Sequence, residues 1–254
     1  MDLVDTHVHL DDPAFDPDRD AVVARAKAAG VDRQVVPAID AATWPRLRGC
    51  CAADPGLFPA YGLHPLLLEA HRPGHLDDLR RWIERERPVA IGECGLDYYV
   101  DGLDRDTQLH YFDAQLRLAR EFDLPVIVHA RRAVEDVIVA VRKVGGLRGV
   151  VHSYGGSVEQ ARQLEEAGFL LGFGGPATYP GANRIRKVVA GVPLAQVLLE
   201  TDAPDQPLCG HQGQRNEPCR LPGVLEAIAE IRGEAPADIA KATTANAERL
   251  FALL

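Results

Sequence analysis

Two histidines near the amino terminus have a spacing that could bind a metal ion. His7 and His9 lie in the segment DTHVHL, residues 5–10, directly after a short apolar run. Alternate side chains of a strand point to the same side, so the two imidazoles are expected to project together while Val8 points away. Imidazole is the commonest metal ligand, but histidines near a strand end can equally be packed or hydrogen-bonded. The pair alone leaves both interpretations open.

The remainder of the chain alternates between short apolar or β-branched runs and longer amphipathic stretches. The runs predict strands at residues 3–6, 33–37, 57–62, 89–93, 125–129, 149–152, 169–174 and 197–201. The stretches predict helices at 19–29, 43–53, 76–86, 106–122, 133–144, 158–167 and 182–190, followed by a Pro/Gly-rich segment at 203–222 and helices at 223–232 and 236–253. Strands that alternate with helices form parallel βαβ units, so the pattern predicts an α/β fold, a single (β/α)8 TIM barrel.

No linker or shift in composition divides the chain, so we expect residues 1–254 to form a single domain. A doubly wound open sheet is the alternative architecture. That fold carries a glycine-rich phosphate-binding turn after its first strand, and no strand-to-helix turn of this sequence has one. The barrel is therefore the preferred interpretation.

Composition and charge narrow the class of protein. Hydrophobic residues make up 46% of the chain, which is enough for a substantial core. The first residues lack a basic segment followed by an apolar one, and no apolar run is long enough to cross a bilayer, so we expect a cytoplasmic protein without membrane contact. The formal net charge is −9, so no global positive field would hold long nucleic acid. An anionic substrate must be held locally.

The cysteines favour a reducing compartment. Their number is 5, which is odd, and their spacing forms no regular disulfide framework. Cys209 and Cys219 flank His211, but without a second close pair they are weak evidence for a structural zinc site. Free thiols are the expectation.

Seven polar residues follow the predicted strands at their carboxyl ends, where barrel enzymes assemble their active sites. They are His7, His9, His64, Glu93, His129, His152 and Asp202. Unpaired buried carboxylates are costly, so a core has little reason to collect imidazoles and two carboxylates at one place unless they bind metal. One ion would not need six donors, whereas a carboxylate can bridge two ions roughly 3.5–4 Å apart. Glu93 is the natural bridge in a predicted site for two divalent ions.

Few basic residues lie where they could hold an anion near this predicted site. Arg131 and Arg132 follow His129, and Arg184, Arg186 and Lys187 lie in the segment GANRIRKVV. Arginine matches the geometry of phosphate oxygens, so Arg131 is a candidate substrate-binding residue. Such charges also commonly lie on a solvated helix surface, and both roles stay open for them.

Motifs spread along the chain resemble those of the TatD family of metal-dependent deoxyribonucleases, a branch of the amidohydrolase-like barrels. The matching segments are DTHVHL (5–10), GLHP (62–65), GECGLDYY (92–99), VHAR (128–131), HSYGG (152–156), ETDAP (200–204) and NAERLF (246–251). They run in the family's order over essentially the whole chain. Related phosphotriesterase and dihydroorotase branches commonly use a carboxylated lysine as bridge, whereas this chain has Glu93 at the fourth strand.

The resemblance implies a divalent-metal phosphodiesterase that removes nucleotides from DNA, often from the 3′ end. It implies that His7, His9, Glu93 and Asp202 hold one ion, and that Glu93, His129 and His152 hold the second. It also implies that His64 lies beside the metals and faces the scissile phosphate. The segment QPLCGHQGQRNEP is similar to the loop of one subgroup.

The predicted mechanism is hydrolysis by a metal-activated water. Asp202 would bind one ion and accept the water's proton, Glu93 would hold the ions apart, and His64 would contact the phosphate or only orient a ligand. The ions could be zinc, manganese or magnesium. The substrate would be a DNA end or a small phosphodiester, and the sequence indicates no protein partner.

Two other functions remain open from the sequence. A hydrolase of a small ester, lactone or amide could use the same two-metal centre, because fold and metals do not fix the bond that is broken. A non-catalytic metal-binding protein would normally close its site with four ligands. Beyond the metal site, Asp97 is expected to orient a ligand or an arginine. Tyr98 and Tyr99 could stack on a nucleobase or pack within their loop.

Overall fold

The computed structural model describes residues 2–253, and all eight predicted strands are present. They are β1 (Leu3–Asp5), β2 (Val31–Pro37), β3 (Leu57–Tyr61), β4 (Ala90–Asp97), β5 (Val126–Arg131), β6 (Gly149–Val151), β7 (Phe169–Phe173) and β8 (Val197–Leu199). Every residue of β4 is buried, as expected for a parallel strand covered on both faces. The short runs of apolar and β-branched residues therefore mark the interior of the sheet.

The predicted helices form with ends within about two residues of the expected positions. They are α1 (Arg19–Ala28), α2 (Trp44–Ala52), α3 (Gly74–Glu86), α4 (Arg105–Phe122), α5 (Val134–Val144), α6 (Val158–Glu166), α7 (Asn183–Gly191), α8 (Leu221–Arg232) and α9 (Pro236–Phe251). Side-chain caps fix the starts of two helices. Ser157 and Gln160 form a capping box at the start of α6, and Asp104 accepts a bond from the Thr107 backbone N–H at the start of α4.

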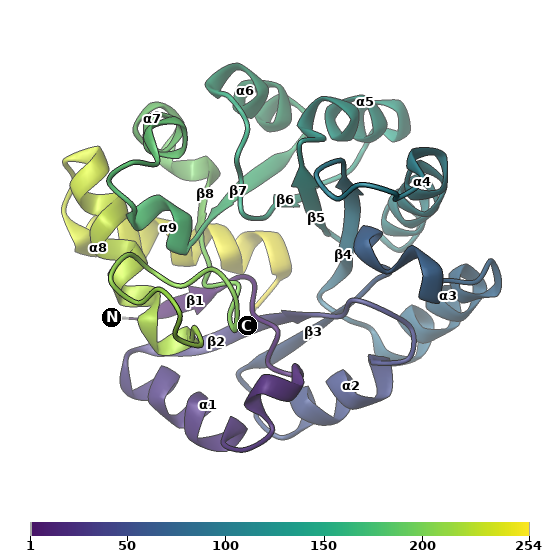
Figure 1. The fold of residues 1–254 in the computed structure, drawn as a ribbon, viewed down its shortest axis with the longest axis horizontal. Coiled ribbons are helices and arrows are strands. Elements are labelled where there is room, and N and C mark those ends of the chain that lie inside the picture. The colour runs from purple at the N-terminus through teal and green to yellow at the C-terminus, as the bar shows by residue number, and fades with distance from the viewer. Residues whose placement is uncertain (1, 254) are drawn as a thin grey trace.

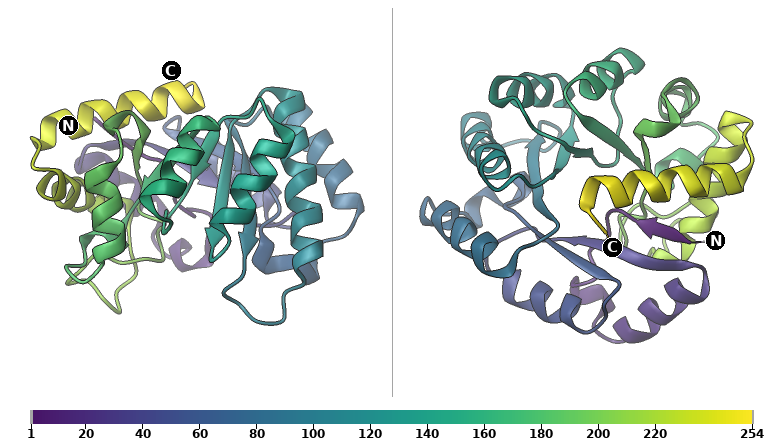
Figure 2. Two further views of the ribbon diagram at one scale, coloured as in Figure 1. Left: turned by 90° about the horizontal axis from the view of Figure 1, so that it is seen from above. Right: turned by 180° about the vertical axis from the view of Figure 1, so that it is seen from behind.

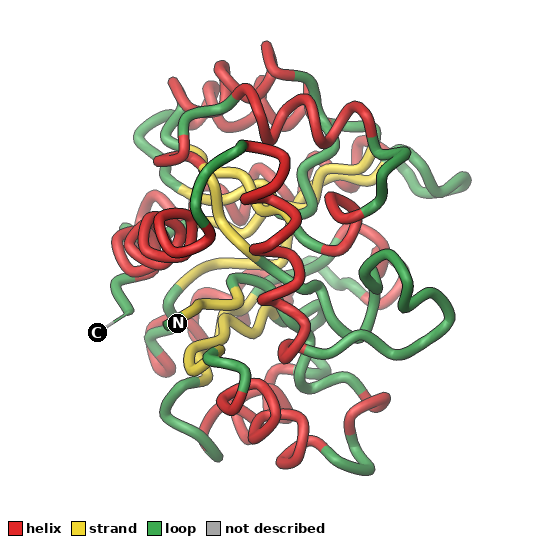
Figure 3. Tube along the Cα trace, turned by 90° about the vertical axis from the view of Figure 1, so that its left-hand side faces the viewer, coloured by secondary structure: helices red, strands yellow, loops and turns green. Residues whose placement is uncertain are grey.

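The strands pair in parallel and in chain order, β1 to β8, with the helices outside them (Figures 1 and 3). Just after the short strands β8 and β1, backbone hydrogen bonds join the two ends of the sheet. The Thr6 N–H donates to the Leu199 carbonyl at 3.0 Å, and the Asp202 N–H donates to the His7 carbonyl at 2.9 Å. These bonds complete a nearly closed (β/α)8 TIM barrel, which confirms the predicted fold.

The amino-terminal end of the barrel is covered by α9, which crosses it in the view from behind (Figure 2). A separate apolar cluster lies at this end. It includes Val4, Val35, Ala60, Ala90, Ile127, Val150 and Leu198 from the strands and Ala247, Leu250, Phe251 and Leu253 from α9 and its end. The long loops gather at the opposite end (Figure 3). One end of the barrel is thus sealed by apolar packing, and the other is free to form a site.

Every strand except β2 ends at a residue other than the predicted one, by one or two residues in most cases and by four in β4. The local reasons are clear for β1 and β4. β1 ends at Asp5, because the carboxylate of Asp5 accepts bonds from the His7 and Thr201 N–H groups and turns the chain toward β8. β4 continues to Asp97, because its second half pairs with β5 as far as Arg131. Within residues 2–253, no helix is long and apolar enough to cross a membrane.

We predict that Phe251→Ala lowers the free energy of unfolding by about 3–5 kcal/mol, because it leaves a cavity in the apolar seal formed by α9. Phe251 is buried, with 2% of its surface exposed. Urea denaturation followed by circular dichroism measures the change. The control is Val139→Ala on the outer face of α5, where the side chain is 58% exposed and the substitution should cost less than about 0.5 kcal/mol. A loss below about 1 kcal/mol for Phe251→Ala would show that α9 does not seal the barrel.

Candidate metal centre

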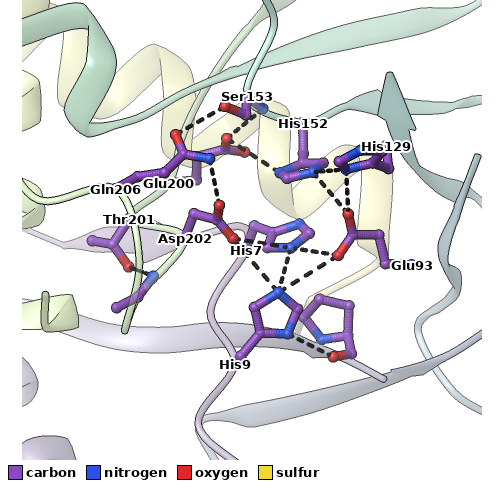
Figure 4. A network of polar contacts seen from close by, with 12 residues as sticks. His7, His9, Glu93, His129, His152, Ser153, Glu200, Thr201, Asp202 and Gln206 are labelled. Carbon is purple, nitrogen blue, oxygen red and sulfur yellow. Dashed lines mark hydrogen bonds and ion pairs between the residues drawn. The ribbon is translucent and has the colours of Figure 1, made fainter. Parts of the chain in front are cut away.

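The seven polar residues predicted from the strand ends do meet at the loop end of the barrel. His7 and His9 follow β1, His64 follows β3, His152 follows β6 and Asp202 follows β8, while Glu93 and His129 lie within β4 and β5. Figure 4 shows most of these side chains pointing toward one another around Glu93. Because parallel strands all end at the same side of a barrel, residues distant in sequence share this floor.

Glu93 lies at the centre of the group. Its Oε1 atom is 2.8 Å from His152 Nε2, 3.0 Å from His64 Nε2 and 3.1 Å from His129 Nδ1. Its Oε2 atom is 3.2 Å from His7 Nε2 and 3.5 Å from His9 Nε2. The side chain is only 2% exposed. Each oxygen of one buried carboxylate therefore faces a different set of imidazoles, as a bridging ligand requires.

Asp202 faces the same group from the β8 side. Its Oδ1 atom lies 3.5 Å from the Nε2 atoms of both His7 and His9. Its Oδ2 atom accepts a 2.5 Å bond from Gln206 Nε2, and Gln206 Oε1 in turn accepts from the Ser153 hydroxyl at 2.9 Å (Figure 4). The carboxylate is thus held with one oxygen toward the histidines and the other toward the loop.

Three overlapping sets of donor atoms could each hold a metal ion. They are His7, Glu93 and His152; His7, His9 and Asp202; and His64, Glu93 and His129. Glu93 and His7 each belong to two sets, so the sets form one continuous centre. The family resemblance separates His64 from the metal ligands, whereas here its nitrogen lies as close to Glu93 as that of His129 does.

The donor set fits a divalent ion chemically. Nε2 of His7 lies 3.2 Å from Nε2 of His9, and Nε2 of His152 lies 3.4 Å from Nδ1 of His129. Two imidazole nitrogens that face each other need a shared proton, or a cation between them and the carboxylates, to avoid opposing lone pairs. Neutral imidazoles and carboxylates together suit zinc, manganese or a similar ion.

A buried carboxylate behind the donors, Asp97, holds His129. Asp97 Oδ2 lies 2.8 Å from His129 Nε2, which leaves the other ring nitrogen of His129 toward Glu93. Asp97 is fixed by the backbone N–H groups of Tyr99 and Val100. Asp97 was expected to orient a ligand or an arginine, and the side chain it contacts is His129, one of the predicted ligands. Such carboxylate–histidine pairs set the ring orientation at metal sites.

Glu200 supports the centre from behind His152, and sequence reasoning assigned it no role. Its Oε1 atom lies 3.7 Å from His152 Nδ1 and accepts a 2.5 Å bond from the Ser153 N–H. Gly172 makes room for it, because a Cβ atom there would lie 2.0 Å from Glu200 Oε2. The only available signal was that Glu200 stands two residues before Asp202 in the segment ETDAP. Gln206 had no signal, because it belongs to an irregular loop.

The carboxylates and histidines shift one another's pKa values. Burial disfavours the charge of Glu93, but the surrounding imidazoles outweigh burial and bring its pKa well below the usual range. Burial also opposes protonation of His9 and His152, yet contacts with Asp202 and Glu93 raise the pKa of His9 to about 9 and that of His152 well above its usual value. Burial lowers the pKa of His7. Cationic charge is therefore favoured between these groups.

The other predicted residues lie apart from the donors. Arg131 is exposed and lines the cavity above the centre, which has a volume of about 1010 Å³ and is also lined by His9, His64, Glu93, His129, His152 and Asp202. All five cysteines are free, as expected. Within residues 2–253, no donor set includes Cys209, His211 or Cys219.

Comparisons with known proteins agree with this geometry. A family model described as TatD related DNase matches residues 4–252. The metal-dependent hydrolase YjjV of Escherichia coli K12 is 41% identical over 252 residues, which cover 98% of this chain and 97% of that protein. The metal-dependent hydrolase YabD of Bacillus subtilis 168 is 38% identical, with 98% of each chain covered. The crystal structure of YjjV, a TatD homologue, superposes with a TM-score of 0.94 at 40% identity and covers 98% of each chain.

We predict that loading the protein with Mn²⁺ near neutral pH releases more than about one proton per chain, because an ion must displace protons from imidazoles. The pKa of His9 is raised to about 9 and that of His152 lies well above its usual value, so both rings carry protons below those values. Metal affinity should accordingly fall as the pH is lowered. It should increase as the pH is raised, until these histidines have lost their protons. Calorimetry in buffers of different ionisation enthalpy measures the number of protons released. His9→Gln should lower that number, while His110→Ala on α4 should leave it unchanged. Binding without proton release would contradict the assigned charges.

Proposed function

Because this chain belongs to the family of TatD-related DNases and is a metal-dependent hydrolase, we propose that it is a deoxyribonuclease that removes nucleotides from the 3′ end of single-stranded DNA. The substrate class is a DNA end or a small phosphodiester. A cavity formed by loops at the mouth of a barrel admits a strand end more readily than a continuous duplex. The chain's net charge of −9 argues against tight binding along a long duplex.

The observation that best supports the proposal is the donor set around Glu93 at the floor of one large cavity. Five imidazole nitrogens lie within 3.5 Å of the two oxygens of Glu93, and the cavity opens above them. A structural metal site is normally closed by four ligands and has no such opening. The arrangement therefore favours hydrolysis over a purely structural metal site.

We assign two divalent ions to this centre, either zinc, manganese or magnesium. Following the family resemblance, His7, His9, Glu93 and Asp202 would hold one ion, and Glu93, His129 and His152 would hold the other. All six residues belong to the overlapping donor sets described above. Ions held there would supply charge that polarises a water molecule and stabilises the negative charge developing on the phosphate.

The chain's own residues would then direct the reaction. Asp202, held through Oδ2 by Gln206, accepts the proton of the attacking water on its other oxygen. The water oxygen forms a bond to phosphorus, the bond from phosphorus to the 3′ oxygen breaks, and that oxygen takes up a proton. His64 lies on the cavity wall beside Glu93 and donates a hydrogen bond to a phosphate oxygen or to the leaving oxygen.

Two further residues complete the assigned roles. Glu93 keeps the donors of both ions in register, because each of its oxygens faces different histidines. Arg131 binds the scissile phosphate from the cavity wall, since its planar guanidinium matches two phosphate oxygens.

A parallel substrate panel with Mn²⁺ and Mg²⁺ tests the proposal. It compares 3′-labelled and 5′-labelled single-stranded oligonucleotides, blocked ends, duplex DNA, RNA and small phosphodiester, ester, lactone and amide substrates. The proposal predicts stepwise shortening from the 3′ end that stops when Glu93→Ala removes the bridging carboxylate. Efficient lactone, ester or amide hydrolysis without oligonucleotide cleavage under either metal would instead assign the chain to a small-molecule hydrolase class.

We predict that Asp202→Asn lowers turnover of a cleaved oligonucleotide by about 10²–10⁴-fold, because the amide cannot accept the proton of the attacking water. The side chain stays similar in size, so the melting temperature should change little. Steady-state kinetics and thermal unfolding of the metal-loaded enzyme measure both effects. Asp238→Asn, which changes an exposed carboxylate at the start of α9, is the matched control. Unchanged turnover of Asp202→Asn between about pH 6 and 9 would remove Asp202 from this role.

A further inference from the structure

The rim of the cavity is divided by charge. Asp11 and Asp12 follow β1 and Asp205 follows β8, so this side of the rim is acidic. Arg131 and Arg132 lie at the end of β5, which stands across the barrel from β1 in strand order. Going round the rim from there, Arg184 lies on α7, between β5 and the acidic side (Figure 1). We call these three arginines the basic rim.

The guanidinium groups of the basic rim are not used in ion pairs within residues 2–253. Those of Arg131 and Arg132 lie over the ring of Tyr99, with their central carbons 3.6 Å and 4.7 Å from the ring centre. Arg184 lines the cavity and donates from Nε to the Gly156 carbonyl at 3.1 Å, and its two terminal nitrogens make no hydrogen bond within residues 2–253. All three side chains are exposed.

An arginine on the acidic side behaves differently. Arg46 also lines the cavity, but its guanidinium donates to the Asp11 carbonyl at 2.6 Å and forms an ion pair with Asp16. Among the described residues that line the cavity on this side, Glu135 is the carboxylate outside the donor centre, and it accepts a 3.3 Å bond from Gln160. The three arginines of the basic rim against Glu135 leave the lining of this part of the rim positive in a chain whose net charge is −9. Uncompensated positive charge beside a hydrolytic cavity favours an anionic ligand.

The size of the cavity bears on how much of the substrate it holds. Its volume of about 1010 Å³ is at the upper end for small-molecule sites. The donor centre occupies the floor, so a scissile phosphate bound there leaves the rim for a further part of the same molecule. The next phosphates of a DNA strand are the anions that a single-stranded substrate would bring to it.

We propose that two members of the basic rim, Arg132 and Arg184, form a second phosphate subsite that binds the backbone phosphates next to the scissile one, which Arg131 holds. This proposal rests on the proposed function. The bound strand leaves the centre over the β5–α5 loop and α7, away from Asp11, Asp12 and Asp205. The substrate class is therefore an oligonucleotide of at least two phosphates, in preference to an isolated phosphodiester.

Tyr99 is a positioning residue for this subsite. Its ring is 46% exposed, and it does not line the cavity; instead it supports the two guanidinium groups by cation–π contact. The sequence left open whether Tyr99 stacks on a base or packs in its loop. The structure places arginines on the ring. A flexible arginine side chain loses less freedom on binding when an aromatic ring already holds it.

The first test measures binding by the metal-loaded enzyme. The probe is a fluorescent single-stranded oligonucleotide with phosphorothioate linkages at its 3′ end, and fluorescence anisotropy is followed as salt rises. Arg132→Ala and Arg184→Ala should each weaken binding about five- to ten-fold and make the slope of log affinity against log salt shallower by about 0.7, the value for one lost contact to a single strand. Lys187→Ala is the matched control, because Lys187 is exposed on α7 and does not line the cavity.

The second test compares kcat/KM for a trinucleotide with that for a diester containing one phosphate. Arg132→Ala and Arg184→Ala should lose about five- to ten-fold more with the trinucleotide than with the diester, through KM. Tyr99→Ala releases both Arg131 and Arg132, so it should raise KM for both substrates and raise it further for the trinucleotide. Tyr99→Phe should restore both KM values because the ring is kept.

The outcomes separate the two proposals. If the wild-type enzyme neither binds nor cleaves the oligonucleotide, the proposed function fails and this subsite falls with it. If the wild-type enzyme cleaves it and the Arg132 and Arg184 variants behave like Lys187→Ala, the subsite alone is overturned. Equal losses of kcat/KM with the trinucleotide and the diester for Arg132→Ala and Arg184→Ala would also overturn the subsite, because they would mean a general effect on the centre.

Discussion

The buried carboxylate of Glu93 constrains the whole loop end of the barrel. A charge that is only 2% exposed costs several kcal/mol unless polar or charged partners surround it. Here those partners are histidines supplied by loops and strands from four other parts of the barrel, and each must arrive with a ring nitrogen toward one carboxylate. The position of Glu93 therefore requires the strands to be in the correct register around the ring. It also makes a divalent cation the natural occupant of the centre.

The bonds that close the barrel also build the centre. The Asp202 N–H donates to the His7 carbonyl, and the His9 N–H donates to the Ala203 carbonyl at 2.8 Å. Asp5, buried just before His7, accepts bonds from Thr201 through both the N–H and the hydroxyl, and burial raises the pKa of Asp5 to about 8. The join between β8 and β1 and the histidine pair that follows β1 are thus one structural unit. Disturbing the join would disturb the geometry of the donors.

Sequence alone was sufficient for the barrel and for the seven polar residues at the strand ends, because both follow from periodicity and from the rule that parallel strands end on one side. It could not predict that His64 lies as close to Glu93 as His129 does, because these distances depend on strand register and side-chain rotamers. Glu200 and Gln206 were missed for a related reason. Their roles come from the space left by Gly172 and from the path of an irregular loop, and neither produces a periodic signal. The stacking of arginines on Tyr99 is likewise a consequence of how β5 and the β4–α4 loop meet.

Anomalous scattering from crystals loaded with Mn²⁺ tests most directly the claim that Glu93 bridges a two-ion centre. We expect two peaks about 3.5–4 Å apart, one among Glu93, His7, His9 and Asp202 and the other among Glu93, His129 and His152. Peaks confined to the loop that carries Cys209, His211 and Cys219, or a fully loaded crystal with no peak beside Glu93, would contradict it.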